Sequence, residues 1–273
     1  MTQSRCFNRA FTVPEMLAVV AVIVILLSLL LPSIVKARQA AERSVCGSNL
    51  HQLSMANRLY AMENRGRNVH ERPEALSWML KLSPFLGGSS GDKETRVSSM
   101  NSIPQFRCPT ASKPGAGPSA SLGFLGTATE AWGPIQTGNG REGLIGSYGL
   151  NMWTEAPEQV PDSAAGPEAW HFAKLAHVSE PSNSPLLGDC IWDGGGWPGG
   201  NIDGSNPSPP VNPYSPTWTE GSLARFAMYR HFRGVNMAFF DGSSRWVTFE
   251  GVWGLKWHNN FKPLAGPPWQ PVF

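Results

Sequence analysis

Apolar residues dominate one stretch near the N-terminus, where no charged residue interrupts the sequence between Glu15 and Lys36. About twenty residues in an α-helix reach about 30 Å, which is the hydrocarbon thickness of a bilayer. A buried helix of a water-soluble domain rarely stays apolar on every face over this length. The pattern therefore predicts a membrane-spanning helix over about residues 14–35.

Two other membrane segments share part of this pattern, namely a cleaved secretory signal and an ordinary signal anchor. The apolar region of a secretory signal usually has only about 7 to 15 residues. Residues 31–40, LPSIVKARQA, contain no Ala-x-Ala cleavage site and are already charged. Neither alternative explains Glu15, because an acidic group at the edge of a span is costly and usually has a functional partner. We therefore expect the segment to remain in the protein.

A second periodic pattern continues the helix beyond the span. The residues that recur at spacings of four and three are Cys46, Leu50, Leu53, Asn57 and Tyr60. This spacing places them on one face of an α-helix. Gly66 marks the expected end of the helix. We expect one long helix, with its first half in lipid and its second half packed against a globular head.

The head, residues 66–273, is long enough for one sizeable core. Three short apolar or aromatic segments bounded by turn residues are typical of strands: 143–153, 184–193 and 235–249. In the last of these, Asp241 and the glycine after it suit a hairpin turn that requires a positive φ.

Other parts of the head have less regular patterns. Near-helical spacing of apolar residues from Leu76 to Phe85, followed by two glycines, predicts a second short helix. The polar segment 89–99 is expected to be a surface loop, and the prolines and glycines of 103–120 exclude long regular elements. The Gly- and Pro-rich residues 194–221 should form an irregular, exposed insertion.

Together these elements predict an α+β fold, in which a long N-terminal helix packs on a globular head with an antiparallel sheet. The sequence contains 15% charged residues and has a formal net charge of +2. This small charge gives no basic surplus of the kind that nucleic-acid binding needs. We therefore expect no nucleic-acid partner.

The junction before the span has a specific pattern. A short basic leader ends in the small residue Ala10, and Glu15 is the fifth residue of the chain that would begin at Phe11. This segment, RAFTVPEMLAVVAVIVILLSLLLPSIVKAR, resembles the class III signal of type IV prepilins and type II secretion pseudopilins. The resemblance implies that prepilin peptidase removes the leader and N-methylates the new terminus. Basic residues lie on both sides of the span, so the distribution of charge does not decide its orientation. The resemblance itself implies a cytoplasmic N-terminus.

The resemblance divides the chain into a leader, residues 1–10, a pilin-like helix, residues 11–65, and the head. After the cut, the α-amino group of Phe11 would lie four residues before Glu15, and a neighbouring copy shifted along the helix axis could offer its own amine. Pairing is favoured because an unpaired carboxylate in lipid is costly. The expected partners are prepilin peptidase, other copies or related pilin-like subunits, and membrane lipid.

Further motifs extend the resemblance into the head. They are CGSNLHQL at 46–53, FRCP at 106–109, SYGLN at 147–151, and His231 followed by Asp241 and Gly242. In this order they resemble prepilin-type proteins with a His-x9-Asp-Gly signature. His231 and Asp241 could be ligands or a hydrogen-bonded pair, or Asp241 could only fix the turn while His231 lies at a strand edge. We favour a structural role and expect no enzyme, because no nucleophile or oxyanion arrangement is visible.

The cysteines sort by compartment. Cys6 lies in the leader, whereas Cys46, Cys108 and Cys190 would face an oxidising space outside the cytoplasm, where disulfides form. We expect Cys46 and Cys108 to pair, which would join the helix to the head and stabilise it by about 2 to 4 kcal/mol. The alternative is that all three cysteines are small buried apolar residues.

Two groups of residues offer metal ligands. They are His171, His177, Asp189 and Cys190, and Asn201, Asp203 and Ser205. The first group lacks the spacings typical of zinc sites, such as Cys-x-x-Cys. The second group lacks the rest of a calcium loop. We therefore expect neither a metal nor another cofactor.

Two functions fit these expectations. In the first, the protein is a pilin or pseudopilin subunit that crosses the cytoplasmic membrane once, carries its head outside the cytoplasm and assembles through its helix into a type II secretion or type IV pilus-like structure. In the second, the same anchor tethers an extracytoplasmic binding or surface protein that does not polymerise, with Trp192, Trp197 and Trp218 available to a ligand such as a carbohydrate. We expect the first, because such aromatic residues are more often core than binding platform.

Overall fold

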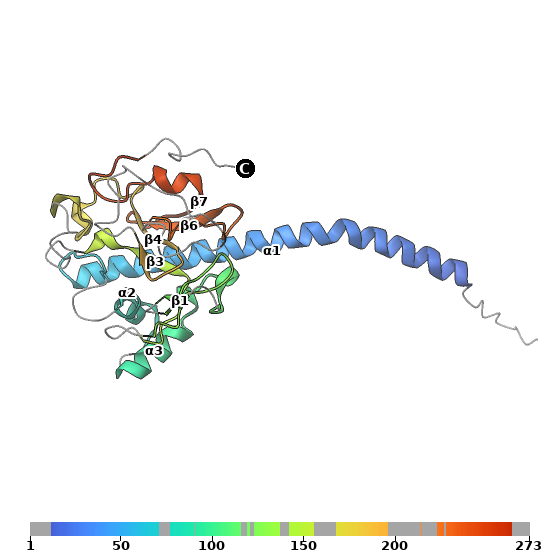
Figure 1. Ribbon diagram of the computed structural model, residues 1–273, viewed down its shortest axis with the longest axis horizontal. Helices are drawn as coiled ribbons and strands as arrows, with labels where there is room; N and C mark the ends of the chain where they lie inside the picture. Colours follow the sequence, from blue (N-terminus) through green and yellow to red (C-terminus); the bar gives the residue numbers. More distant parts are fainter. Residues whose placement is uncertain are drawn as a thin grey trace, which may run out of the picture. The chain divides into compact units, whose positions relative to one another are not determined.

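The computed structural model describes residues 12–70, 77–89, 91–115, 119–120, 123–136, 142–155, 168–195, 214, 223–226 and 228–263. The chain forms two compact units, residues 1–41 and 42–273. The long helix α1 (Val13–Glu63) contributes to both units, and the described strands and shorter helices belong to the second (Figure 1).

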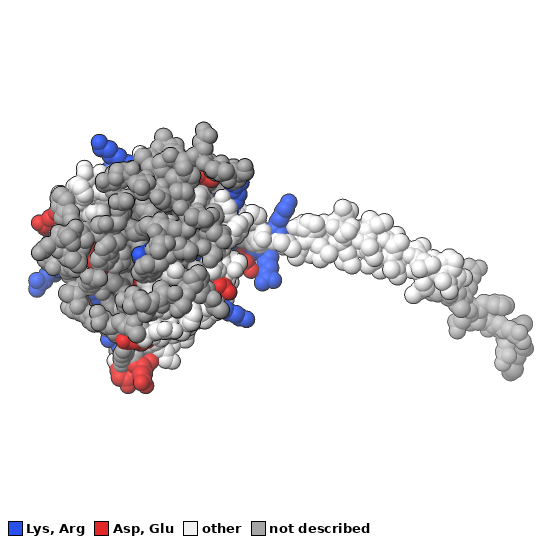
Figure 2. Space-filling view, in the orientation of Figure 1, with Lys and Arg blue, Asp and Glu red and all other residues white. Residues whose placement is uncertain are grey.

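The first half of α1 is an apolar helix whose N-terminus is capped by nearby residues of the chain. The Glu15 carboxylate accepts hydrogen bonds from the Thr12 backbone N–H at 2.8 Å and from the Thr12 hydroxyl at 2.7 Å. This is the Thr-x-x-Glu capping pattern, in which an acidic side chain of the first turn binds back to the residue before the helix. The large apolar side chains that follow are exposed, and Figure 2 draws most of this stretch in white. By its length and composition the helix can cross a membrane.

The second half of α1 belongs to the head and buries one face there. The buried residues on this face are Cys46, Asn49, Leu50, Leu53, Ser54, Ala56, Asn57 and Ala61. Gly66 follows the end of α1 with a φ of +78°, which glycine adopts without steric cost, and its N–H donates to the Ala61 carbonyl at 2.8 Å. The predicted helix, its buried face and its end are confirmed, although Tyr60 is only partly buried.

The head contains a five-stranded sheet in the order β5-β3-β4-β6-β7. The strands are β3 (Tyr148–Asn151), β4 (Pro185–Asp189), β5 (Gly194–Gly195), β6 (Gly234–Phe239) and β7 (Ser244–Thr248). The α+β fold is confirmed, and each of the three predicted segments contains a strand. The sheet is mixed rather than antiparallel, because β5 pairs with β3 in parallel. The segment predicted as one strand over 184–193 ends at Asp189, and the chain returns along the other side of β3 as β5.

The β6–β7 hairpin packs against the second half of α1. Its turn has Gly242 at a φ of +94°, and the Asp241 carboxylate accepts hydrogen bonds from the N–H of Ser243 at 2.8 Å and from its hydroxyl at 2.7 Å. The Ser54 hydroxyl on α1 donates to the Phe239 carbonyl at 3.3 Å. The predicted hairpin and its positive φ are confirmed. Asp241 fixes the turn, in agreement with the structural interpretation of this residue.

The short helix predicted after residue 75 is present. Helix α2 (Trp78–Leu82) continues into a 3-10 turn, Ser83–Leu86, and Gly87 closes this turn with a φ of +82°. The two glycines therefore end the element as predicted. Leu76, at which the prediction began, lies outside the described residues.

Helix α3 (Lys93–Ser102) contradicts the surface loop predicted for 89–99. The Asp92 side chain accepts a hydrogen bond from the Thr95 N–H at 2.8 Å and caps the helix. Met100, near the other end, is fully buried in the core. A cap and one buried anchor therefore stabilise a helix whose sequence has no apolar stripe.

The remaining described elements are short. They are β1 (Ser119–Ala120), β2 (Gly123–Phe124) and the 3-10 helices Pro104–Phe106, Pro109–Ala111, Met152–Thr154, Glu168–Trp170, Leu175–His177 and Glu250–Gly254. The absence of long elements predicted for 103–120 is confirmed for its described residues. Of the insertion predicted over 194–221, only β5 and Tyr214 are described, and the rest lies outside the described residues.

Candidate functional site

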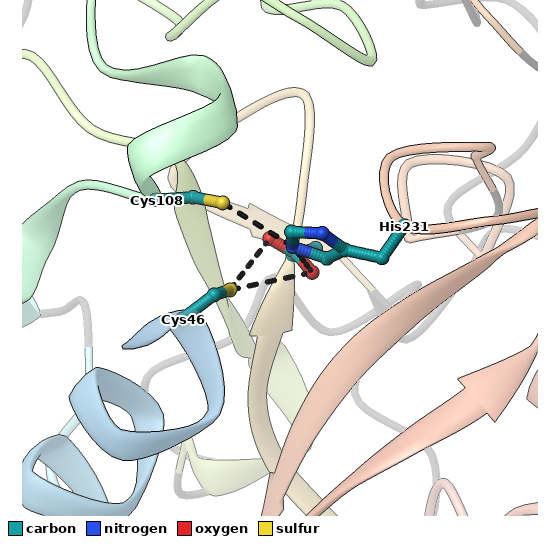
Figure 3. A group of neighbouring side chains, drawn as sticks. Cys46, Cys108 and His231 are labelled. Carbon is teal, nitrogen blue, oxygen red and sulfur yellow. Dashed lines mark hydrogen bonds and ion pairs between the residues drawn. The ribbon is translucent and has the colours of Figure 1, made fainter. Parts of the chain in front are cut away.

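Side chains with metal-ligating atoms converge in the core of the head (Figure 3). Cys46 comes from α1, Cys108 from the residue before the 3-10 helix Pro109–Ala111, Asp189 from the end of β4 and His231 from the loop before β6. One ligand atom of each residue lies within 4.8 Å of the ligand atoms of the other three, and all four residues are buried. We call these four residues the Cys-His-Asp cluster.

Asp189 has more polar contacts than the other residues of the cluster. Its Oδ1 accepts a hydrogen bond from Arg230 Nη1 at 3.1 Å, and its Oδ2 accepts one from the Asn236 backbone N–H at 2.7 Å. Both side chains of the Arg230–Asp189 ion pair are fully buried. The central position of β4 between β3 and β6 carries this carboxylate into the core. A positive charge and a neighbouring strand therefore hold it in place.

His231 faces two members of the cluster through one ring nitrogen. Its Nε2 lies 3.3 Å from Cys108 Sγ and 3.5 Å from Asp189 Oδ2. The backbone N–H of His231 donates to the Gly234 carbonyl at 2.9 Å. Trp246 Nε1 donates to the His231 carbonyl at 2.7 Å. These two backbone bonds fix the loop that carries the imidazole.

The residues after His231 adopt an unusual backbone conformation. Phe232 and Arg233 have φ values of 49° and 59°. Non-glycine residues seldom adopt this left-handed region, and each one costs about 1 to 3 kcal/mol. These two residues turn the chain directly into β6. His231 therefore lies just before the start of the strand, with its ring in the cluster.

Cys46 contacts both Asp189 and a tyrosine of β3. Its Sγ lies 3.5 Å and 3.7 Å from the two carboxylate oxygens of Asp189. The hydroxyl of Tyr148, which is fully buried, donates to the same sulfur at 3.3 Å. Arg230 also donates to the carbonyl of Ser147, the residue before Tyr148. Cys46, Cys108, Tyr148 and His231 therefore each come from a different one of the four short sequence motifs of the head.

Burial and neighbouring groups shift the pKa values of the Cys46 and Cys108 thiols in opposite directions. Burial raises the pKa of Cys46 well above its ordinary value, and the nearby Cys108 and Asp189 raise it further. Burial also acts to raise the pKa of Cys108, but hydrogen bonds with Cys46 and His231 outweigh it and bring this pKa to about 6. Cys108 is therefore the thiol that ionises first.

Burial and neighbouring groups also shift the pKa values of His231, Tyr148 and Arg230. Burial acts to lower the pKa of His231, but the Asp189 carboxylate and Cys108 outweigh it and raise this pKa above its ordinary value. Burial raises the pKa of Tyr148 well above its ordinary range, so its hydroxyl remains a donor to Cys46. For Arg230, the burial cost is outweighed by Asp189, which raises the pKa and keeps the guanidinium charged.

The geometry suits metal binding better than nucleophilic catalysis. In a thiol-imidazole-carboxylate relay, the carboxylate binds the ring nitrogen that does not face the nucleophile. Here Cys108 and Asp189 both face Nε2 of His231. Two sulfurs, one imidazole nitrogen and one carboxylate oxygen form a donor set that zinc accepts.

The predicted site residues do not all meet. Ala10 and Phe11, the expected processing site, lie outside the described residues. Glu15 is exposed in the first unit. Cys46 and Cys108 are brought together as predicted, but both are free thiols, so the expected disulfide is not present. Each sulfur instead contacts a carboxylate or an imidazole.

The signature pair is also separated. His231 lies before β6, whereas Asp241 and Gly242 form the turn after that strand. A direct His231–Asp241 interaction is therefore wrong, because the strand lies between them. His231 is buried in the cluster rather than at a strand edge, and Asp189 is its carboxylate neighbour.

Asp189 has different neighbours from those that the sequence suggested. The His171 Nδ1 lies 2.6 Å from the Glu155 carbonyl, His177 is exposed, and Cys190 is buried but is not one of the cluster ligands. The second candidate group, Asn201, Asp203 and Ser205, lies outside the described residues. The available signal was an acidic residue at the end of PLLGD, an otherwise uncharged strand.

The tryptophans proposed as a binding platform are only partly described. Trp192 is buried, and its ring centre lies 6.0 Å from that of Trp132. Trp192 is therefore a core residue. Trp197 and Trp218 lie outside the described residues.

Comparison with known proteins adds no family to these observations. No family model matches the chain, and neither a curated protein nor a solved structure matches it. Function therefore has to be inferred from the residues and their geometry.

Proposed function

We propose that the protein is a pilin-like or pseudopilin subunit. Prepilin peptidase removes residues 1–10, α1 anchors the chain in the cytoplasmic membrane, and the head lies outside the cytoplasm. The subunit then assembles into a type II secretion or type IV pilus-like structure. The observation that carries the proposal is the construction of α1, which joins an exposed apolar half with Glu15 in its first turn to a half buried in a folded head.

The exposed apolar surface of α1 supports membrane anchoring. Its large side chains from Val13 to Val35 are mostly half or more exposed in the isolated chain. A surface of this kind associates with lipid or with other apolar surfaces, because its transfer out of water is favourable. Lipid covers it before assembly, and the helices of neighbouring subunits cover part of it afterwards.

Glu15 supports assembly through the same half of α1. Its carboxylate is exposed, and its hydrogen bonds go to Thr12, three residues away. An ionised carboxylate within an apolar surface is costly in lipid unless it meets a positive group. Cleavage before Phe11 creates an α-amino group on every copy, and this group pairs with Glu15 of a neighbouring copy.

The expected contact between copies extends in one direction. When each helix is shifted along the next, the two surfaces in contact differ, and the contact repeats without closing. Such heterologous contacts produce a helical filament.

Replacement of Glu15 by Gln separates charge pairing from helix capping. Gln at this position keeps a capping hydrogen bond to Thr12 but removes the negative charge. We expect Glu15→Gln to stay in the membrane but to disappear from the filament fraction sheared from cells, as measured by immunoblot. Glu63→Gln, which removes an exposed charge from the other end of α1, is the matched control and should assemble normally.

Three outcomes would count against parts of this proposal. Normal assembly of Glu15→Gln would contradict a role for the charge. Filaments built from chains that retain residues 1–10 would contradict processing. A wild-type chain that is processed and membrane-bound but never enters a filament would favour a tethered extracytoplasmic protein that does not polymerise.

A further inference from the structure

We infer that Cys46, Cys108, Asp189 and His231 form a zinc site that holds a structural ion in the core of the head. The inference goes beyond the proposed function and does not depend on it, because all four residues belong to the second unit. The site would join α1 to the segment around Cys108, to β4 and to the loop before β6. Zinc binding would therefore contribute to the folding free energy of the head.

Three of the six separations between ligand atoms match those of a tetrahedral shell. Zinc binds sulfur at about 2.3 Å and imidazole nitrogen or carboxylate oxygen at about 2.0 to 2.2 Å, so neighbouring ligand atoms lie about 3.3 to 3.8 Å apart. Cys108 Sγ lies 3.3 Å from His231 Nε2, which lies 3.5 Å from Asp189 Oδ2. Cys46 Sγ lies 3.5 Å from Asp189 Oδ1 and 3.7 Å from Oδ2. These three pairs have the required spacing, and the ligand atoms of the other pairs lie within 4.8 Å of one another.

A divalent cation also balances the charge of the site. With both thiols ionised and His231 neutral, the two sulfurs and Asp189 carry three negative charges, and the buried Arg230 supplies one positive charge. A divalent ion then makes the site neutral, as burial requires. Thiolate ligands select zinc over magnesium and calcium, which prefer oxygen ligands.

The surrounding hydrogen bonds are of the kind that orient metal ligands. Arg230 Nη1 donates to Asp189 Oδ1 at 3.1 Å, and the Asn236 N–H donates to Oδ2 at 2.7 Å. Tyr148 donates to Cys46 Sγ at 3.3 Å. Such outer contacts hold ligands in position before the metal binds and tune their basicity.

Two other states of the same residues make different predictions. Without a metal, the site would also be neutral overall if both thiols were protonated, or if a Cys108 thiolate faced a protonated His231, beside the Arg230–Asp189 ion pair. A disulfide between Cys46 and Cys108 would remove both sulfur ligands. The protein would then contain no stoichiometric zinc in either state, so metal content distinguishes these states from the proposed one.

Metal analysis of the full-length protein is the first test. The chain is purified from membranes in detergent without added metal or chelator, and its zinc is measured by inductively coupled plasma mass spectrometry. We expect about one zinc ion per chain. Cys46→Ser and Cys108→Ser should each lose the zinc. Cys190→Ser is the matched control, because Cys190 is also a buried free thiol of the head but is not one of the four ligands.

X-ray absorption at the zinc edge tests the wild-type protein directly, in case a serine variant fails to fold. We expect two sulfur neighbours at about 2.3 Å and two nitrogen or oxygen neighbours at about 2.0 to 2.2 Å. Folded protein without stoichiometric zinc, zinc without sulfur neighbours, or a Cys46–Cys108 disulfide in the native mass spectrum would each overturn the inference. None of these readouts depends on processing of the N-terminus or on filament formation.

Discussion

The two halves of α1 satisfy their polar side chains in opposite ways. In the first half, Glu15 is exposed, and its hydrogen bonds go to Thr12, three residues away. In the second half, Cys46 is fully buried and contacts Asp189 and Tyr148, which come from distant parts of the chain. The polar contacts of the first half are therefore local, and its apolar surface is exposed. The second half is part of the core of the head.

Under the proposed function, this difference separates the residues that anchor the protein from those that stabilise its head. The apolar side chains of the first half are exposed, so we expect substitutions there to alter membrane location or assembly and not the stability of the head. Side chains on the buried face of the second half should alter the free energy of unfolding of the head. Substitutions of each kind test this division.

The largest loss of stability is expected for Asp189→Ala, which leaves the buried Arg230 guanidinium without its carboxylate. An unpaired charge in the core costs about 3 to 5 kcal/mol, so the head should unfold at a much lower urea concentration or fail to fold. Glu180→Ala breaks the ion pair with Lys256, in which the Glu180 side chain is 52% exposed, and should cost less than about 1 kcal/mol. Urea unfolding in detergent, followed by tryptophan fluorescence, compares the two. Equal small losses would contradict the assigned role of Asp189.

A matched leucine pair compares the two halves of α1 directly. Leu50 is fully buried, so Leu50→Ala should lower the free energy of unfolding of the head by about 2 to 5 kcal/mol. Leu27 is 49% exposed in the first half, and Leu27→Ala should change this quantity by less than about 0.5 kcal/mol. The same urea titration measures both variants. A similar loss of unfolding free energy in the two variants would contradict this division between the two halves of α1.

Zinc removal should affect only the half of α1 that enters the head. A ligand that binds only the folded state stabilises it by about 2.7 kcal/mol when its free concentration is a hundred times Kd. We therefore expect chelation to lower the Tm of the head, measured by circular dichroism, and added zinc to restore it. Flotation of the chain with lipid vesicles should not change. A Tm that is insensitive to both treatments would argue against a structural ion.

The smallest effect is expected at the hairpin turn that contacts α1. Arg58 Nη1 donates to the Asp241 carbonyl at 3.0 Å, and His51 Nδ1 lies 2.6 Å from the Gly242 carbonyl. At a φ of +94°, the new Cβ of Gly242→Ala would be strained and would lie 3.1 Å from Arg58 Nη1. We expect a loss of about 1 to 2 kcal/mol in urea titrations.

Gly47 provides the control for this substitution, because it lies in α1 and its added Cβ would meet only ordinary contacts at 3.8 Å and 3.9 Å. Gly47→Ala should therefore be neutral or should stabilise the helix by up to about 1 kcal/mol. A larger loss from Gly47→Ala than from Gly242→Ala would contradict the assignment of strain to the turn.

Elements governed by local rules were predictable from the sequence. The helical face that includes Cys46 follows from a spacing of three and four, and the hairpin follows from the chemistry of Asp241 and Gly242. Helix α3 was missed because its stability depends on the Asp92 cap and on the burial of Met100, not on an apolar stripe.

The candidate site was only partly predictable. Cys46, Cys108 and His231 are motif residues, but their sequence positions give no distances between them. Asp189 could not be chosen as the partner of His231, because the two approach one another only when β4 and β6 pair in the sheet. Asp241 was the carboxylate suggested by the sequence, yet β6 separates it from His231. Spacing along the chain is a weak guide to contacts formed by long-range strand pairing.

The most direct test of the pilin-like assignment is the mass of the N-terminal peptide of the protein isolated from native membranes. A chain that begins at N-methylated Phe11 and lacks residues 1–10 is the predicted result. A chain that still carries Met1 to Ala10, or one that begins beyond Val35, would contradict prepilin processing and would leave an ordinary anchor or a secreted protein in its place.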